Sequence, residues 1–289
     1  MDIRFVPLSD FDKGFLNLRS DCENCFGLCC VALYFSASEG FPSDKNAGQP
    51  CLNLQPEFRC CVHENLMERG LKGCLAFDCF GAGQKISQAS YGGHDWLKAP
   101  ESAKQMFEVF LTMRQLHELL WYLTEALTRQ PARSIHAALS TMLDETERLT
   151  QLSPDFLIEL DVAVHRAKVN TLLIKTSDFV RAEARRSQKV HSRRQKTFSR
   201  GSDLIGADLR KIDLRGENLR GAYLIAADLR GTDLSGADLI GADFRDTDLC
   251  GTNLCNSLFL TQGQLNAAKG NASTKLPTSL TRPTHWDRD

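Results

Sequence analysis

The sequence lacks a long hydrophobic run. Its longest uncharged, mainly apolar stretch, CFGLCCVALYF, covers residues 25–35 and has 11 residues, which is too few to cross a bilayer. The opening stretch, MDIRFVPLSDFDKGF, mixes charges and has no apolar centre of the kind found in a secretory signal peptide. We therefore expect a cytoplasmic protein with no membrane partner.

Charge of one sign is also missing. The chain has 35 Lys and Arg against 36 Asp and Glu, a net charge of −1, so no whole-protein field recruits nucleic acid. Residues 181–200 are the exception, with eight Arg or Lys and one Glu. A solvated tether is the simplest interpretation of this basic segment. A contact with an anion or nucleic acid is the alternative, weakened because Phe198 is its one aromatic residue.

Common catalytic signatures are absent as well. Neither G-x-S-x-G nor H-E-x-x-H occurs, and the G-A-G within residues 78–87 lacks the third glycine of a dinucleotide loop. We therefore assign no catalytic residue from the sequence, and leave open whether the protein is an enzyme.

Cysteine, in contrast, is abundant and unevenly placed. Nine of the eleven cysteines fall between residues 22 and 79, and we assign no role to the other two, Cys250 and Cys255. The spacing is C-x2-C-x3-C-C, then C-x8-C-C, then C-x4-C. Thiols stay reduced in the cytoplasm, so this density favours a metal or thiol chemistry over disulfides. Zinc, iron, copper and an iron–sulfur cluster all remain open, as do a structural site, a catalytic site and metal-free thiols.

Residues 20–80 resemble the CxxCxxxCC family of zinc- or iron-chelating domains. The resemblance is carried by CENCFGLCC (22–30), PCLNL (50–54), FRCCVH (58–63) and GCLAFDC (73–79). It implies that the metal ligands come from the following cysteines: Cys22, Cys25, Cys29, Cys30, Cys51, Cys60, Cys74 and Cys79. Cys61 is an extra thiol, and His63 is the best non-cysteine candidate. For His63, His94 and His117, an ordinary hydrogen-bonded histidine is nevertheless the favoured interpretation.

The chain divides into segments of different pattern. Residues 1–100 are irregular and form the predicted metal-binding domain. Residues 101–184 are helical, with an apolar stripe at three- and four-residue spacing and helix-start signals at Ser153 and Pro154. The basic linker occupies 185–200, and an extended tail occupies 271–289. Residues 201–270 form a separate unit.

That unit repeats every five residues over 203–262, in twelve units with Leu or Phe at each centre. The residue two positions before each central Leu or Phe is usually small, and Ile212 and Glu217 are the departures. The pattern A-(D/N)-L-x-x resembles the pentapeptide-repeat family, which implies a right-handed quadrilateral β-helix of three coils. A capping box at Thr261–Gln264 predicts a short helix over 262–269 that closes it.

These segments predict an α+β multidomain protein: an irregular cysteine-rich domain, a helical bundle and a β-helix with a capping helix. The favoured function is a metal-dependent module that binds a protein or peptide partner. One alternative is an iron or copper enzyme whose repeats dock a peptide or protein substrate. A less favoured alternative, which the repeat resemblance suggests, is a DNA mimic that modulates a topoisomerase. Exposed coil ends would also allow a homodimer.

Overall fold

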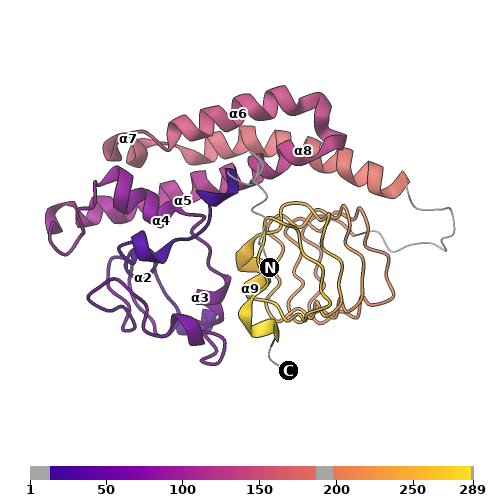
Figure 1. Cartoon of the computed structure of the whole chain (residues 1–289), viewed down its shortest axis with the longest axis horizontal. Helices are drawn as coiled ribbons and strands as arrows, with labels where there is room; N and C mark the ends of the chain where they lie inside the picture. The colour runs from indigo at the N-terminus through magenta and orange to yellow at the C-terminus, as the bar shows by residue number, and fades with distance from the viewer. Residues whose placement is uncertain (1–13, 187–197, 288–289) are drawn as a thin grey trace, which may run out of the picture.

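The computed structural model describes residues 14–186 and 198–287. Figure 1 shows three parts: a layer of long helices, the cysteine-rich part on one side beneath it, and the repeat segment on the other. Most of the predicted basic linker lies outside the described residues, as do the first thirteen residues. Among the helices that are described, none combines the length and apolar character needed to cross a bilayer.

The longest element is α5 (Pro100–Thr128), with Pro100 in its first turn. The predicted apolar stripe is buried from Met106 through Phe110 to Leu123, and its last residue, Leu127, is partly buried. Its first half packs against the cysteine-rich part, and its second half, from Leu119 onward, packs against the leucines of the repeats. Helix α5 is therefore the shared support of both parts.

Three further helices cover α5: α6 (His136–Leu149), α7 (Pro154–Glu159) and α8 (Val162–Arg186). A short 3₁₀ helix, η5 (Gln130–Ile135), joins α5 to α6. The sequence predicts one helix from residue 153 to about 184, but the structure divides it in two. The reason is Asp161, whose side chain accepts hydrogen bonds from the backbone N–H groups of Ala163 and Val164 and so begins a new helix.

The cysteine-rich part contains only short helical elements. They are η1 (Cys22–Asn24), α2 (Leu28–Ala32), η2 (Ala37–Glu39), η3 (His63–Asn65), α3 (Lys72–Ala76) and α4 (Ala82–Gln84). A π-helix, η4 (Lys85–Ser90), follows α4 directly. Loops connect these elements, and this part is held together by packing and local hydrogen bonds instead of a sheet or a bundle.

The predicted quadrilateral β-helix is wrong. Residues 14–186 and 198–287 contain no β-strand and no sheet, and helices dominate the regular structure. The repeats instead form stacked coils joined by single parallel bridges between residues 20 positions apart, such as Asp208 and Asp228. Each five-residue unit contains a turn, so too few consecutive extended residues remain for a strand. Positive φ at most corners favours glycine, and Ala226 and Asp246 adopt it without being glycine.

The interior of the coils is filled by the central residues of the repeat, and Leu214, Leu234 and Leu254 are fully buried. The small residues that precede them, such as Ala237 and Thr252, are buried as well. Glu217, one of the two departures, is also buried because its carboxylate lies 3.3 Å from Arg185 of α8. The departure therefore has a packing reason, which is contact with the helical layer.

The C-terminal end of the repeat segment contacts α5, α9 (Gln262–Asn266) and the tail. Helix α9 has the predicted capping box, in which Thr261 and Gln264 bond reciprocally, although it is shorter than expected. Figure 1 shows α9 between the coils and α3. The buried Glu125 of α5 accepts the Phe259 backbone N–H at 2.9 and 3.0 Å. Trp286 of the tail packs on Gly270 and donates to the Ala268 carbonyl.

Candidate functional site

The cysteine-rich part encloses a cavity of about 620 Å³ that is lined mainly by thiols and aromatic rings. Eight of the nine clustered cysteines reach its wall: Cys22, Cys25, Cys29, Cys30, Cys60, Cys61, Cys74 and Cys79. His63 lines it too. The structure thus brings together residues that lie up to 57 positions apart in the sequence.

The first block of the motif forms one wall through η1 and α2. Asp21 caps η1 by accepting the backbone N–H groups of Glu23 and Asn24. Gly27, at φ +65°, turns the chain into α2, where Cys29 and Cys30 follow. The sulfur atoms of Cys29 and Cys30 lie 3.9 Å apart. Two thiolates on one tetrahedral ion with 2.3 Å bonds are separated by about 3.8 Å, so this pair has nearly the required spacing.

The second block is tied to the first through backbone contacts. The Cys51 N–H donates to the Cys30 carbonyl at 2.9 Å, and a bridge between Leu54 and Cys60 closes a small hairpin. The Arg59 guanidinium donates to the carbonyls of Cys22 and Glu23 and so holds the hairpin against η1. Arg59 is therefore a positioning residue that its sequence pattern alone does not reveal.

The last block closes the cavity from α3 and the segment after it. Cys74 lies on α3, and Cys79 follows three residues after its end. The Cys79 sulfur lies 3.1 Å from the Ser20 hydroxyl. A Cβ atom on Gly83 would lie 2.6 Å from the Cys25 sulfur, so only glycine allows α4 to approach this wall.

Burial holds these thiols in the protonated form. Desolvation raises the pKa of Cys25 to about 11 and that of Cys74 to about 12, and it also raises the pKa of Cys22. Hydrogen bonding to Cys29 is the main cause of the raised pKa of Cys30, and hydrogen bonding to Cys30 is the main cause for Cys60. A bound metal reverses this balance, because it coordinates the thiolate and releases the proton.

The side chains around the cavity have the right chemistry for a metal, but their positions do not form a complete coordination shell. All eleven cysteines lie within the described residues and are free thiols, and a set rich in sulfur suits zinc, copper(I) or iron. In the part of the chain that the structure describes, no three His, Cys, Asp or Glu groups are placed closely enough to hold one ion. The structure gathers seven of the eight predicted cysteine ligands around one space, together with Cys61 and His63.

The remaining predicted residues have different surroundings. Cys51 is buried outside the cavity wall, and its sulfur accepts the Asn53 N–H at 3.5 Å. Cys61 lies on the wall but is exposed. His94 contacts the Tyr91 carbonyl, and His117 contacts the Phe80 carbonyl at 2.8 Å, each an ordinary hydrogen bond. The sequence offers no signal for Ser20 or Gly83, because their role arises only from packing.

Comparison with known proteins identifies the repeat segment and one relative of the whole chain. Residues 218–254 match the family model described as pentapeptide repeats, in eight copies. The chain is similar to the uncharacterized protein YybG of Bacillus subtilis strain 168, with 58% identity over 275 residues that cover 95% of this chain and 97% of the relative. No solved structure matches the chain. The resemblance of residues 20–80 to the CxxCxxxCC family has no such match and stays a prediction.

Proposed function

The chain belongs to the same family as YybG of Bacillus subtilis, and for this pentapeptide-repeat protein we propose a metal-dependent protein-interaction function. In this proposal the cysteine-rich part binds zinc or iron, and the repeat segment offers a surface to a protein partner. Helix α5, which packs against both parts, keeps the two in a fixed relation.

The observation that carries the metal proposal is the convergence of eight free thiols from three sequence blocks on one cavity. A small core has little reason to gather so many thiols for packing alone, since aliphatic side chains would fill the same space. A part with only short helices also gains the most from a bound ion, because the binding free energy adds to its folding free energy.

The charges on the repeat surface favour a general protein-binding surface over a DNA mimic that modulates a topoisomerase. A DNA mimic requires an unbalanced negative surface, whereas here several of the outward aspartates pair with arginines. Arg210 lies within 2.8 Å of Asp208 and 3.2 Å of Asp228, and Arg230 lies within 2.6 Å of Asp228. These side chains form a ladder of alternating charge along one side of the coils.

Metal analysis of protein purified without oxygen tests the first half of the proposal. We expect stoichiometric zinc or iron, and we expect the double variant Cys29→Ser/Cys30→Ser to lose it. Cys250→Ser/Cys255→Ser is the matched control, because these cysteines lie in the repeats, and it should keep the metal. Wild-type protein without metal, or an unchanged metal content in the first variant, would contradict the proposal.

The absorption spectrum of the same sample separates the structural role from the catalytic alternative. Zinc held by thiolates has no visible colour, whereas an iron–sulfur centre absorbs strongly in the visible range. A colourless zinc protein that unfolds in its cysteine-rich part on chelation fits an interaction module. A coloured, redox-active iron centre would favour the enzyme instead.

A further inference from the structure

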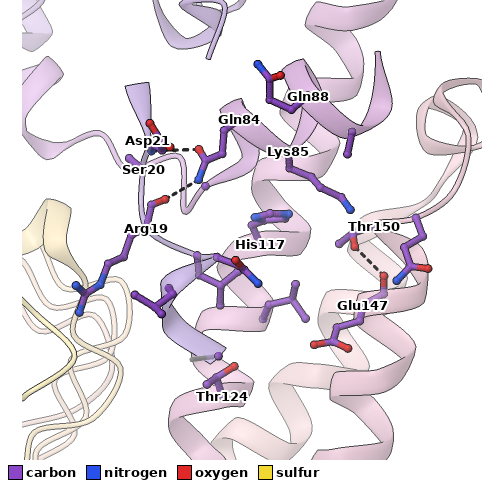
Figure 2. Close-up of a pocket in the computed structure, with 18 of the residues that line it drawn as sticks. Arg19, Ser20, Asp21, Gln84, Lys85, Gln88, His117, Thr124, Glu147 and Thr150 are labelled. Atoms are coloured by element: carbon purple, nitrogen blue, oxygen red, sulfur yellow. Dashed lines mark hydrogen bonds between the residues drawn. The ribbon is translucent and has the colours of Figure 1, made fainter. Parts of the chain in front are cut away.

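A second and larger cavity, of about 860 Å³, adjoins the thiol cavity, and Ser20 lines both. Residues 14–24, the α4–η4 segment, α5 and α6 form its walls. Figure 2 shows Lys85 reaching across from η4 toward α6, with His117 of α5 beside it and Glu147 projecting from α6. Leu120, Leu127 and Leu143 form an apolar patch on the wall, and the rest of the wall is mainly polar and includes Arg19 and Asp21.

Lys85 is the first residue of the π-helix η4 and is only partly exposed. Within the residues that the structure describes, its ammonium group forms no ion pair and no hydrogen bond. Single turns of π-helix are rare and are frequently found at functional sites. A cation on a cavity wall without a counter-ion can form a charge-assisted hydrogen bond with an anionic ligand.

His117 supplies a hydrogen-bond acceptor beside this cation. Its Nδ1 lies 2.8 Å from the Phe80 carbonyl oxygen, and a carbonyl can only accept, so Nδ1 carries the proton. Burial, aided by the nearby Lys85, lowers the pKa of His117 to about 4. The imidazole is therefore neutral at neutral pH, and its Nε2 lone pair is left to accept a hydrogen bond from a ligand.

Glu147 supplies an opposite charge from the far wall. Its side chain is exposed, and within the described ranges its carboxylate has no ion-pair partner. Lys85 and Glu147 line the same cavity without pairing with each other. Two separated charges of opposite sign across an opening are complementary to a ligand that itself carries both charges.

From this arrangement we infer that the cavity binds a small zwitterion of the amino-acid class. The ligand carboxylate pairs with Lys85, its ammonium group pairs with Glu147, and one of its N–H groups donates to His117 Nε2. The leucine-lined wall receives the ligand side chain. This site is independent of the metal proposal, since none of the predicted metal ligands lines the cavity.

Isothermal titration of the full chain with individual L-amino acids tests the inference. We expect one-to-one binding of at least one of them, and we expect Lys85→Met to weaken it at least about tenfold, as for a lost charged hydrogen bond. Lys98→Met is the matched control, because Lys98 is exposed, pairs with Asp95 and lies outside the cavity. Binding by no amino acid, or equal binding by Lys85→Met, would overturn the inference.

The matched 2-hydroxy acid, which lacks the ammonium group, tests the role of Glu147. We expect this acid to bind wild-type protein about tenfold more weakly than the amino acid. Glu147→Gln should weaken the amino acid and not the hydroxy acid. If both probes bind equally well and Glu147→Gln affects neither, the ligand is a simple anion and the zwitterion assignment is wrong. Circular dichroism of both variants checks that they fold.

Discussion

The cysteine-rich part and the repeat segment are both poor in regular secondary structure, yet they are stabilised in different ways. In the repeats the same contact recurs: a buried Leu or Phe and a backbone bridge to the residue 20 positions away. In the cysteine-rich part no contact recurs, and three blocks meet around one cavity. Stability is therefore distributed in the first part and concentrated in the second.

The largest expected effect is the loss of a buried centre in the repeats. Phe244→Ala should lower the free energy of unfolding by about 3–5 kcal/mol, because the side chain is fully buried and its removal leaves a cavity. Ile205→Ala is the control, since Ile205 points outward and is 57% exposed, and it should stay within about 0.5 kcal/mol. Urea unfolding measures both, and a similar cost for the two variants would refute the buried-centre account.

Metal removal should act on the other part alone. If the free metal concentration before chelation is about 100 to 1,000 times the dissociation constant, chelation under reducing conditions lowers local stability by about 2.7–4.1 kcal/mol. Hydrogen exchange should therefore accelerate in residues 14–99 and stay unchanged in 201–260. The Cys29→Ser/Cys30→Ser variant should not respond to the chelator. Equal acceleration in both parts would show that they are not stabilised separately.

A smaller effect is expected where the two parts meet. Thr261→Ala removes the capping box of α9 and should cost about 1 kcal/mol. Because α9 packs between the coils and α3, exchange should rise on both sides of this contact. Thr278→Ala, at an exposed position in the tail, serves as the control. A change limited to the coils would mean that α9 closes the repeats without joining them to α3.

The smallest effect is expected on the charged ladder. Arg210 is 46% exposed in its side chain, so Arg210→Ala should change stability by no more than about 0.5 kcal/mol despite its two ion pairs. Thermal unfolding at low and high salt measures this. The variant then tests partner binding without a folding defect, and a loss above about 1 kcal/mol would show that the ladder stabilises the coils.

The sequence reveals those features that repeat within it. The five-residue period identifies the repeats because every unit turns one Leu or Phe inward, and the stripe from Met106 identifies α5. The strands that the family resemblance implied are absent because each unit contains its own turn and leaves one bridged residue pair. The period says nothing about how many extended residues remain between turns.

The candidate sites were predictable to different degrees. Cysteine spacing marked the eight cysteines that line the thiol cavity and also Cys51, which does not. Arg59 lies in the FRCCVH block, but its contact with η1 is not visible in that block, and Gly83 lies outside every motif because it acts through a contact with a distant cysteine. Lys85 and Glu147 lie 62 residues apart in ordinary surface patterns, and only the packing of α6 against α5 brings them to one cavity. Sites built across elements leave no local pattern in the sequence.

Metal-edge X-ray absorption of the anaerobically purified full chain is the most direct test of the metal proposal. We predict sulfur scatterers at about 2.3 Å from the metal, the zinc–thiolate distance, and their loss in the Cys29→Ser/Cys30→Ser variant. A shell made only of nitrogen and oxygen, or protein without stoichiometric metal, would contradict the account.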